Sequence, residues 1–405
     1  MRIKFWIDVF CCLIPMPHTR RKMRRKLRMR LNNVDYFARH LTGRPIIIWL
    51  DHALGGGTEV YSYKQFHALR EKYDIIRIQY FPGPDEYHIT NPHVHGVLWT
   101  VRNLDAFTEF CHNAPIAQIV VNNLVIYKDA PKILRWVADL KDTLSSTPNV
   151  SFRGHDFHCI CPSFNLINCD GAYCDLSYSL GCEECWAHRQ MSTRPADNRA
   201  YRAGVRSICD WRAAWGDFLA NTADEVILFS PAIQKIFLRA YPNIGDKIQI
   251  IPHQVRQYPP VKIRPHNEIN IAVLGNVSHQ KGASVITEMA HDIPSNTNII
   301  VIGNMPNAPQ NVHVHGRYSP DKLPRIMSRY NIDIVFIASI WPETFSYTTA
   351  EAMSMGMPIV CYDMGAPAER VRRYSRGYVL TDINPHQNLR EIIEFVIKLR
   401  NIKND

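Results

Sequence analysis

Short apolar runs rich in Ile and Val alternate along the chain with amphipathic segments of helical period. Such runs are typical of strands buried on both faces of a parallel sheet. Residues 130–144 lie between two of them and carry apolar positions at helical spacing. Alternating strands and helices predict an α/β protein with a mostly parallel sheet. The strands predicted in the first half are residues 45–50, 75–79, 116–122, 150–153 and 225–229.

A stretch rich in Pro and polar residues, 256–267 (RQYPPVKIRPHN), separates this block from a second one of the same kind. We interpret it as a linker between two Rossmann-like domains, 34–255 and 268–385, because a chain of 405 residues suits two domains. The strands predicted after the linker are residues 269–274, 298–303, 312–315, 334–338 and 358–362. A C-terminal helix is expected within residues 386–405.

The positive charge of the chain is concentrated at its start. Residues 1–33 contain ten Lys and Arg against one acid, Asp8, so they carry +9 of the formal net charge of +10. The remaining residues are close to neutral. This distribution argues against a nucleic-acid enzyme, which spreads basic residues over a broad face.

The same tail, residues 1–33, contains an apolar and aromatic run, 5–14 (FWIDVFCCLI), ahead of its basic cluster. This run is too short to span a bilayer, which needs roughly twenty residues, and Asp8 within it does not fit a secretory signal. Aromatic residues joined to clustered Lys and Arg are typical of a segment on an anionic membrane surface. A disordered basic arm and an RNA-binding arm remain alternatives.

The most specific pattern lies in residues 341–370 (WPETFSYTTAEAMSMGMPIVCYDMGAPAER). Ser346 is placed to cap a helix over residues 347–355, and Gly356 is expected to end it. The amides around Thr344, Phe345 and Ser346 then lie at a helix N-terminus after a parallel strand, where α/β sheets bind phosphates.

Two glutamates flank these amides, Glu343 in the loop and Glu351 on the second turn of the helix. Carboxylates so placed can accept hydrogen bonds from the hydroxyls of a ligand whose phosphates rest on the amides. An ordinary α/β crossover with solvated glutamates is the alternative.

Residues 334–371, with the PET loop, EAM helix, GMP turn and GAPAER stretch, resemble the donor-binding signature of the retaining glycosyltransferases of family 4. The resemblance implies the GT-B fold, two Rossmann-like domains facing each other across a cleft. It also implies that Glu343 contacts the transferred sugar, that Glu351 holds the nucleotide ribose and that the loop 315–318 holds the base. No metal is expected to be required for catalysis.

Other positions match the same family pattern. Gly56 and Gly57 occupy the turn after the first strand, where the family has a Gly-Gly pair at the cleft. Lys281 matches a lysine that reaches the diphosphate, although Asn276 stands where many members carry Arg. His155 follows a strand at the place where a family His faces the reacting sugar.

A cysteine-rich segment, 151–189, includes Cys161, Cys174, Cys182 and Cys185 in the spacing C-x12-C-x7-C-x2-C. Four thiolates suit a tetrahedral zinc site with no open position, so a zinc ion here would be structural. The spacing is equally compatible with reduced thiols.

We therefore expect a retaining glycosyltransferase that moves a hexose from a UDP- or GDP-sugar to a lipid-linked or polysaccharide acceptor. Its pathway is expected to be the synthesis of lipopolysaccharide or another cell-surface glycan, on the cytoplasmic face of the inner membrane. The predicted catalytic residues are His155 and Glu343, and the predicted donor-binding residues are Gly56, Gly57, Lys281, Thr344, Phe345, Ser346 and Glu351.

Two alternatives stay open. One is a sugar-nucleotide epimerase or a phosphorylase on the same fold, since fold does not fix the reaction. The other is a non-catalytic protein that docks on membrane or RNA. No specific nucleic acid is expected as a partner of the enzyme.

Overall fold

The computed structural model describes residues 34–94, 97–177, 181–188 and 207–402, together with residues 19, 23 and 205. Its contacts divide the chain into two compact units. The first takes its described residues from Met1–Gly154, Met191–Ile227 and Asn243–Gln249, and the second from His155–Gln190, Leu228–Pro242 and Ile250–Asp405. Within the described residues, no helix is long and apolar enough to cross a membrane. The basic tail lies outside them, apart from residues 19 and 23.

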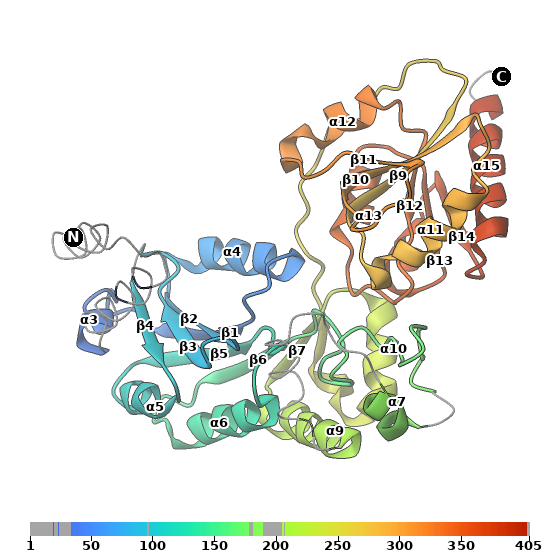
Figure 1. Cartoon of the computed structure of the whole chain (residues 1–405). Helices are drawn as coiled ribbons and strands as arrows, with labels where there is room; N and C mark the ends of the chain where they lie inside the picture. The colour runs from blue at the N-terminus through green and yellow to red at the C-terminus, as the bar shows by residue number, and fades with distance from the viewer. Residues whose placement is uncertain are drawn as a thin grey trace. The chain divides into compact units, whose positions relative to one another are not determined.

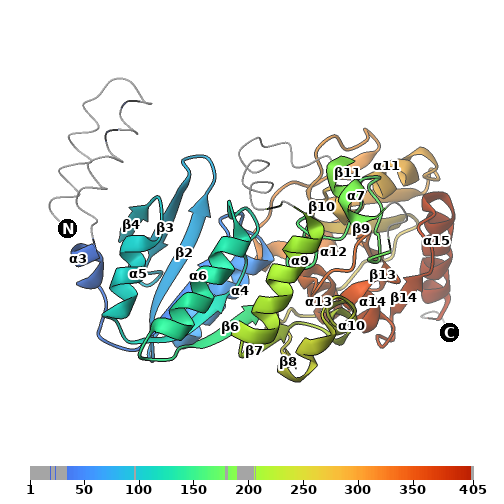
Figure 2. The same cartoon turned by 90° about the horizontal axis from the view of Figure 1, so that it is seen from below.

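The first unit is built on an eight-stranded sheet in the order β4-β3-β2-β1-β5-β6-β7-β8. Helix α4 covers one face of this sheet, and α5, α6 and α9 cover the other (Figures 1 and 2). Its elements are α3 (Val34–Ala38), β1 (Ile46–Asp51), α4 (Gly57–Leu69), β2 (Asp74–Phe81), β3 (Glu86–Thr90), β4 (Leu98–Val101), α5 (Asp105–His112), β5 (Ile116–Val121), α6 (Ala130–Thr143), β6 (Asn149–Arg153), α9 (Ile208–Asp217), β7 (Glu225–Leu228) and β8 (Ile248–Ile250).

Strands β2, β1, β5, β6 and β7 run parallel, as the apolar runs predicted. The sequence did not reveal β3 and β4, which extend the sheet in antiparallel fashion. Both are short and only partly buried, so they lack the continuous apolar run that marks a central parallel strand. The fold of this unit is therefore mixed at one edge.

The second unit contains a six-stranded parallel sheet in the order β11-β10-β9-β12-β13-β14. Helices α11 and α15 contact each other beside it (Figure 1). Its elements are α7 (Cys182–His188), α10 (Pro231–Ala240), β9 (Ile269–Asn276), α11 (Ala283–His291), β10 (Thr297–Asn304), β11 (Val312–Val314), α12 (Leu323–Arg329), β12 (Ile334–Ile337), α13 (Tyr347–Ser354), β13 (Ile359–Tyr362), α14 (Gly365–Val371), β14 (Gly377–Leu380) and α15 (Pro385–Ile402).

The division by contacts differs from the domain boundaries expected from the sequence. The described residues of 155–190 and helix α10 pack with the second unit, although they precede the linker in the chain. The Tyr241 hydroxyl after α10 donates to the carbonyl of Cys159 (2.5 Å). The Glu369 carboxylate on α14 accepts from the amide of Ala232 (2.8 Å) and so caps the N-terminus of α10. Chain order alone cannot show such contacts between distant segments.

Candidate functional site

The loop between β12 and α13 is buried, and it carries Glu343, Thr344 and Phe345 with less than a tenth of each residue exposed. Ser346 occupies the N-cap position of α13, as predicted. Its hydroxyl caps no amide of the helix, however, and it accepts from the Thr349 hydroxyl instead (2.9 Å). The expected side-chain cap was therefore wrong. The backbone of Ser346 is left-handed, with φ 63° and ψ 93°.

The Glu343 carboxylate is fully engaged within the protein. One oxygen pairs with the Lys281 ammonium at 2.5 Å, and the other accepts from the hydroxyl of Ser339. Burial alone would raise the pKa of Glu343. The Lys281 charge and hydrogen bonds from Lys281, Ser339 and Ser346 outweigh burial and hold the pKa below its ordinary value. Glu343 is therefore ionised at neutral pH, and its direct pairing with Lys281 was not foreseen from the sequence.

Lys281 reaches this loop because the backbone after β9 presses against the end of β12. Gly282 follows with φ 83°, and a Cβ there would lie 2.1 Å from the carbonyl oxygen of Ala338. Only glycine tolerates both that conformation and that approach. The Ile340 amide also donates to the carbonyl of Gln280 (3.1 Å), which joins the two loops at the carboxyl edge of the sheet.

His155 lies against the same loop. The Thr344 hydroxyl donates to the backbone carbonyl of His155 (2.7 Å). The imidazole stacks on Phe229 with ring centroids 4.6 Å apart, and it meets His253 edge to face at 5.4 Å. The structure therefore brings the two predicted catalytic residues, His155 and Glu343, to one loop, although 188 positions separate them in the sequence.

Glu351 is half-buried on α13, near two tyrosines. Burial first, and the Glu351 charge second, raise the pKa of Tyr258 and of Tyr318. Tyr318 belongs to the loop that the family resemblance assigns to the base. Tyr258 lies in the predicted linker and was not singled out from the sequence. Both tyrosines therefore lie close enough to interact electrostatically with the carboxylate predicted to hold the ribose.

Gly56 and Gly57 lie in the first unit, at the turn from β1 to α4. Asp51, the last residue of β1, is fully buried and accepts hydrogen bonds from Arg77 (2.8 Å) and from Ser62 on α4 (2.9 Å). This network fixes the direction in which the glycine turn enters α4. An acidic residue at the end of an apolar strand was the signal that could have revealed it.

The cysteine segment brings several of its thiols near one another. The Cys174 thiol interacts electrostatically with Cys161 and Cys182, and the Cys185 thiol with Cys169 and Cys161. Burial raises the pKa of Cys174, and it raises that of Cys185 to about 11. In the described part of the chain, no three or more His, Cys, Asp or Glu side chains form a group that could hold a metal ion. The zinc site therefore gains no support and stays a prediction.

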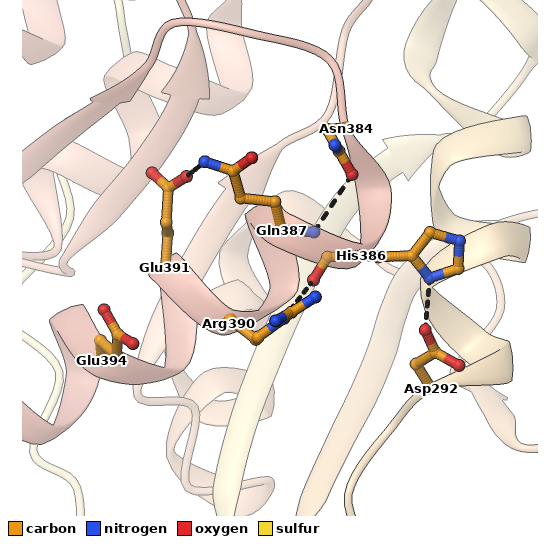
Figure 3. A pocket seen from close by; sticks show the side chains of 7 residues that line it. All are labelled: Asp292, Asn384, His386, Gln387, Arg390, Glu391 and Glu394. Carbon is orange, nitrogen blue, oxygen red and sulfur yellow. Dashed lines mark hydrogen bonds and ion pairs between the residues drawn. The ribbon is translucent and has the colours of Figure 1, made fainter.

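A hollow of about 770 Å³ lies beside the start of α15, and Figure 3 shows the side chains that line it. His386 pairs there with Asp292, and Gln387 donates to Glu391 (2.9 Å). Its lining residues are Asp292, Asn384, His386, Gln387, Arg390, Glu391 and Glu394. Three carboxylates against one guanidinium disfavour a diphosphate, and none of the predicted donor-binding residues lines this hollow.

The arrangement of the chain is similar to that of solved glycosyltransferase structures. HepE from Anabaena, in complex with UDP-glucose, superposes with a TM-score of 0.56 at 15% identity, covering 88% of this chain and 90% of that chain. Sucrose-phosphate synthase from Thermosynechococcus elongatus gives 0.56 at 15% identity over 86% and 90%. The lipopolysaccharide outer core galactosyltransferase WaaB, in its apo form, gives 0.54 at 11% identity over 87% and 90%.

Two sheets with this topology and these neighbours define the GT-B glycosyltransferase fold. More particularly, residues 255–405 match the family model described as Glycosyl transferases group 1. The matched residues include Lys281, Glu343 and Glu351. No curated protein sequence matches the chain significantly.

Proposed function

We propose that the protein is a retaining glycosyltransferase that transfers a hexose from a nucleotide-diphosphate sugar to a saccharide or lipid-linked acceptor. The observation that carries the proposal is the loop on which Glu343, paired with Lys281, lies beside His155 and directly before the N-terminus of α13. The match to the group 1 family model supports it, and so does the likeness to a fold whose member HepE was solved with UDP-glucose.

The charges of this loop suit a departing diphosphate. The ammonium of Lys281 is the more solvent-accessible partner of the pair, so a phosphate oxygen can reach it while the Glu343 carboxylate stays in place. The amides in the first turn of α13 and the helix dipole add positive potential. None of these contributions requires a metal.

In the proposed reaction the bond between the anomeric carbon and the diphosphate oxygen breaks. The acceptor oxygen then bonds to that carbon on the same face, and its proton passes to the departing phosphate. Glu343 positions the sugar, and Glu351 accepts hydrogen bonds from the ribose hydroxyls. His155 faces the sugar at the carbon that reacts. An epimerase on this fold would need no saccharide acceptor, whereas a phosphorylase would act on a saccharide with inorganic phosphate in place of the nucleotide.

Binding and transfer together test the proposal. Thermal shifts with UDP-, GDP- and ADP-sugars identify the donor, because a ligand at 100 times its Kd stabilises the folded state by about 2.7 kcal/mol. The preferred donor is then incubated with saccharide acceptors, and the anomeric configuration of the product is read by NMR. A donor that binds but is epimerised, or is cleaved by free phosphate, would favour the alternative instead.

A further inference from the structure

The peptide at the start of α13 is held in an unusual conformation. Ser346 has φ 63° and ψ 93°, a left-handed backbone that residues other than glycine rarely adopt. Such a conformation persists only where the surroundings over-determine it. The neighbours of Ser346 therefore reveal which side chains hold the amides on which the proposed phosphate site depends.

Arg370, on α14, holds this peptide from one side. Its Nη2 donates to the carbonyl oxygen of Ser346 (3.2 Å), and its Nε donates to the carbonyl of Ala366 on its own helix (3.3 Å). The guanidinium carbon lies 4.5 Å from the centroid of the Phe345 ring, within range of a cation–π contact. One planar group thus fixes the side chain of Phe345 and the backbone of Ser346 together.

Burial lowers the pKa of Arg370 to about 10, against the charges of Glu343 and Glu369, which raise it. Arg370 therefore remains a cation at neutral pH. Burying a cation is costly unless its hydrogen-bond donors are satisfied. Two carbonyl oxygens accept hydrogen bonds from the Arg370 guanidinium here. Its contacts go to the loop before α13 and to its own helix.

His253 holds the same loop from the other side. Its ring stacks on Phe345 with centroids 4.5 Å apart and planes 14° from parallel, and its Nδ1 lies 2.6 Å from the Tyr347 hydroxyl. It also packs edge to face on Phe229 at 4.0 Å, the ring on which His155 stacks. His253 therefore joins the loop before α13 to His155.

We infer that Arg370 and His253 are positioning residues that clamp Phe345 between them and so hold the strained amides at the start of α13 in the geometry a diphosphate needs. This inference rests on the proposed function, since it concerns the same donor site. Neither residue is assigned a contact with the donor. Their effect is to keep the amides in place before the charge of the leaving group develops.

Four substitutions separate positioning from charge and from general stability. Arg370→Met removes the clamp, and Arg370→Lys keeps the charge but loses the planar fork. Arg373→Met makes the same substitution as Arg370→Met, but at an exposed residue of the same region, and serves as the control. His253→Asn removes the stacking face and tests the clamp from the other side, including where Arg370→Met does not fold.

Hydrogen exchange of the peptide covering residues 343–350 is the first readout, with calorimetric binding of UDP and the kcat for transfer as the second and third. We expect Arg370→Met, Arg370→Lys and His253→Asn to speed exchange of this peptide at least tenfold and to lower kcat at least tenfold. Exchange elsewhere in the second unit and all properties of Arg373→Met should stay at parent values.

If the exchange rate of this peptide is unchanged in Arg370→Met and His253→Asn, the clamp is overturned. If Arg370→Lys behaves like the parent, Arg370 acts through its charge alone, and its positioning role is overturned. A parent protein that neither binds UDP nor transfers sugar would instead count against the proposed function. The exchange measurement would still judge the clamp in that case, because it needs no ligand.

Discussion

Lys281 and Glu343 form an ion pair whose two members differ in their access to solvent: the carboxylate side chain is 6% exposed and that of the lysine is 35% exposed. The buried partner depends on the pair, whereas the open partner can be hydrated or bind another anion. This asymmetry determines what happens when either charge is removed.

Replacing Lys281 by Met should leave the Glu343 carboxylate buried without its counter-ion, so the folded-state pKa should rise above the ordinary value. When the pKa of a carboxyl group is higher in the folded state than in the unfolded state, the protein is more stable at low pH, and this stability is lost as the pH rises through the folded-state pKa. The variant should therefore be more destabilised at pH 8 than at pH 5. The loss at pH 8 should be about 2–3 kcal/mol, at the low end for a buried pair because the ammonium is partly screened.

Urea denaturation at both pH values measures this loss. Glu343→Gln is the matched control: the ammonium returns to water, and the loss should be smaller and equal at pH 5 and pH 8. An equal loss at both pH values in Lys281→Met would show that Glu343 does not depend on this pair. In the parent, whose Glu343 pKa is lowered, the contribution should fade instead as pH falls below about 4.5.

Replacing Glu351 by Gln should mainly weaken donor binding. It removes charge-assisted hydrogen bonds to the ribose of roughly 1.5–3 kcal/mol, which corresponds to a roughly 10- to 150-fold higher Kd.

Glu343→Gln should depress kcat more than nucleotide affinity, because its predicted contact is to the reacting sugar. Calorimetry with the nucleotide and steady-state kinetics check both. Transfer at the parent rate by both variants would make the motif structural in this protein.

Replacing Gly282 by Ala should unfold or misplace the Lys281 loop. The new Cβ would meet the Ala338 carbonyl, and about 1–3 kcal/mol of overpacking would add to the cost of the left-handed backbone. Gly316→Ala is the control, since it has φ +88° with no atom within 4 Å and should lose only about 1–2 kcal/mol. Equal stabilities of the two variants in thermal unfolding would contradict the close approach of the loops.

Deleting residues 1–33 tests the proposed membrane tail. The truncated protein should no longer sediment with vesicles containing anionic lipid, because it loses +9 of formal charge and the apolar run. Its activity on a soluble acceptor should be preserved. Unchanged sedimentation would rule out this tail as the membrane-binding element.

Metal analysis decides between zinc and free thiols at Cys161, Cys174, Cys182 and Cys185. Protein purified without added zinc should hold one zinc per chain and lose stability in chelator if the prediction is correct. A ratio well below one, with an unchanged melting temperature in chelator, would establish reduced thiols.

The sequence by itself predicted most of the parallel strands, though not β14, and the loop and helix that carry the proposed site. The apolar runs that became β1, β9 and β12 are local patterns, and burial on both faces requires such runs wherever a central parallel strand lies. The loop and helix from Glu343 to Glu351 also form within one short segment. They could therefore be predicted from a cap position, a helical period and the closing Gly356.

Only the tertiary structure decided how these pieces meet. Ser346 has the expected position but not the expected cap: its backbone has a positive φ that local propensity disfavours, and its hydroxyl accepts from Thr349 rather than from an amide of the helix. The pairing of Lys281 with Glu343 joins the ends of two adjacent strands, β9 and β12, that lie far apart in the sequence. Periodicity describes how one segment buries its own faces, whereas such contacts depend on strand order and on the close approach of two loops.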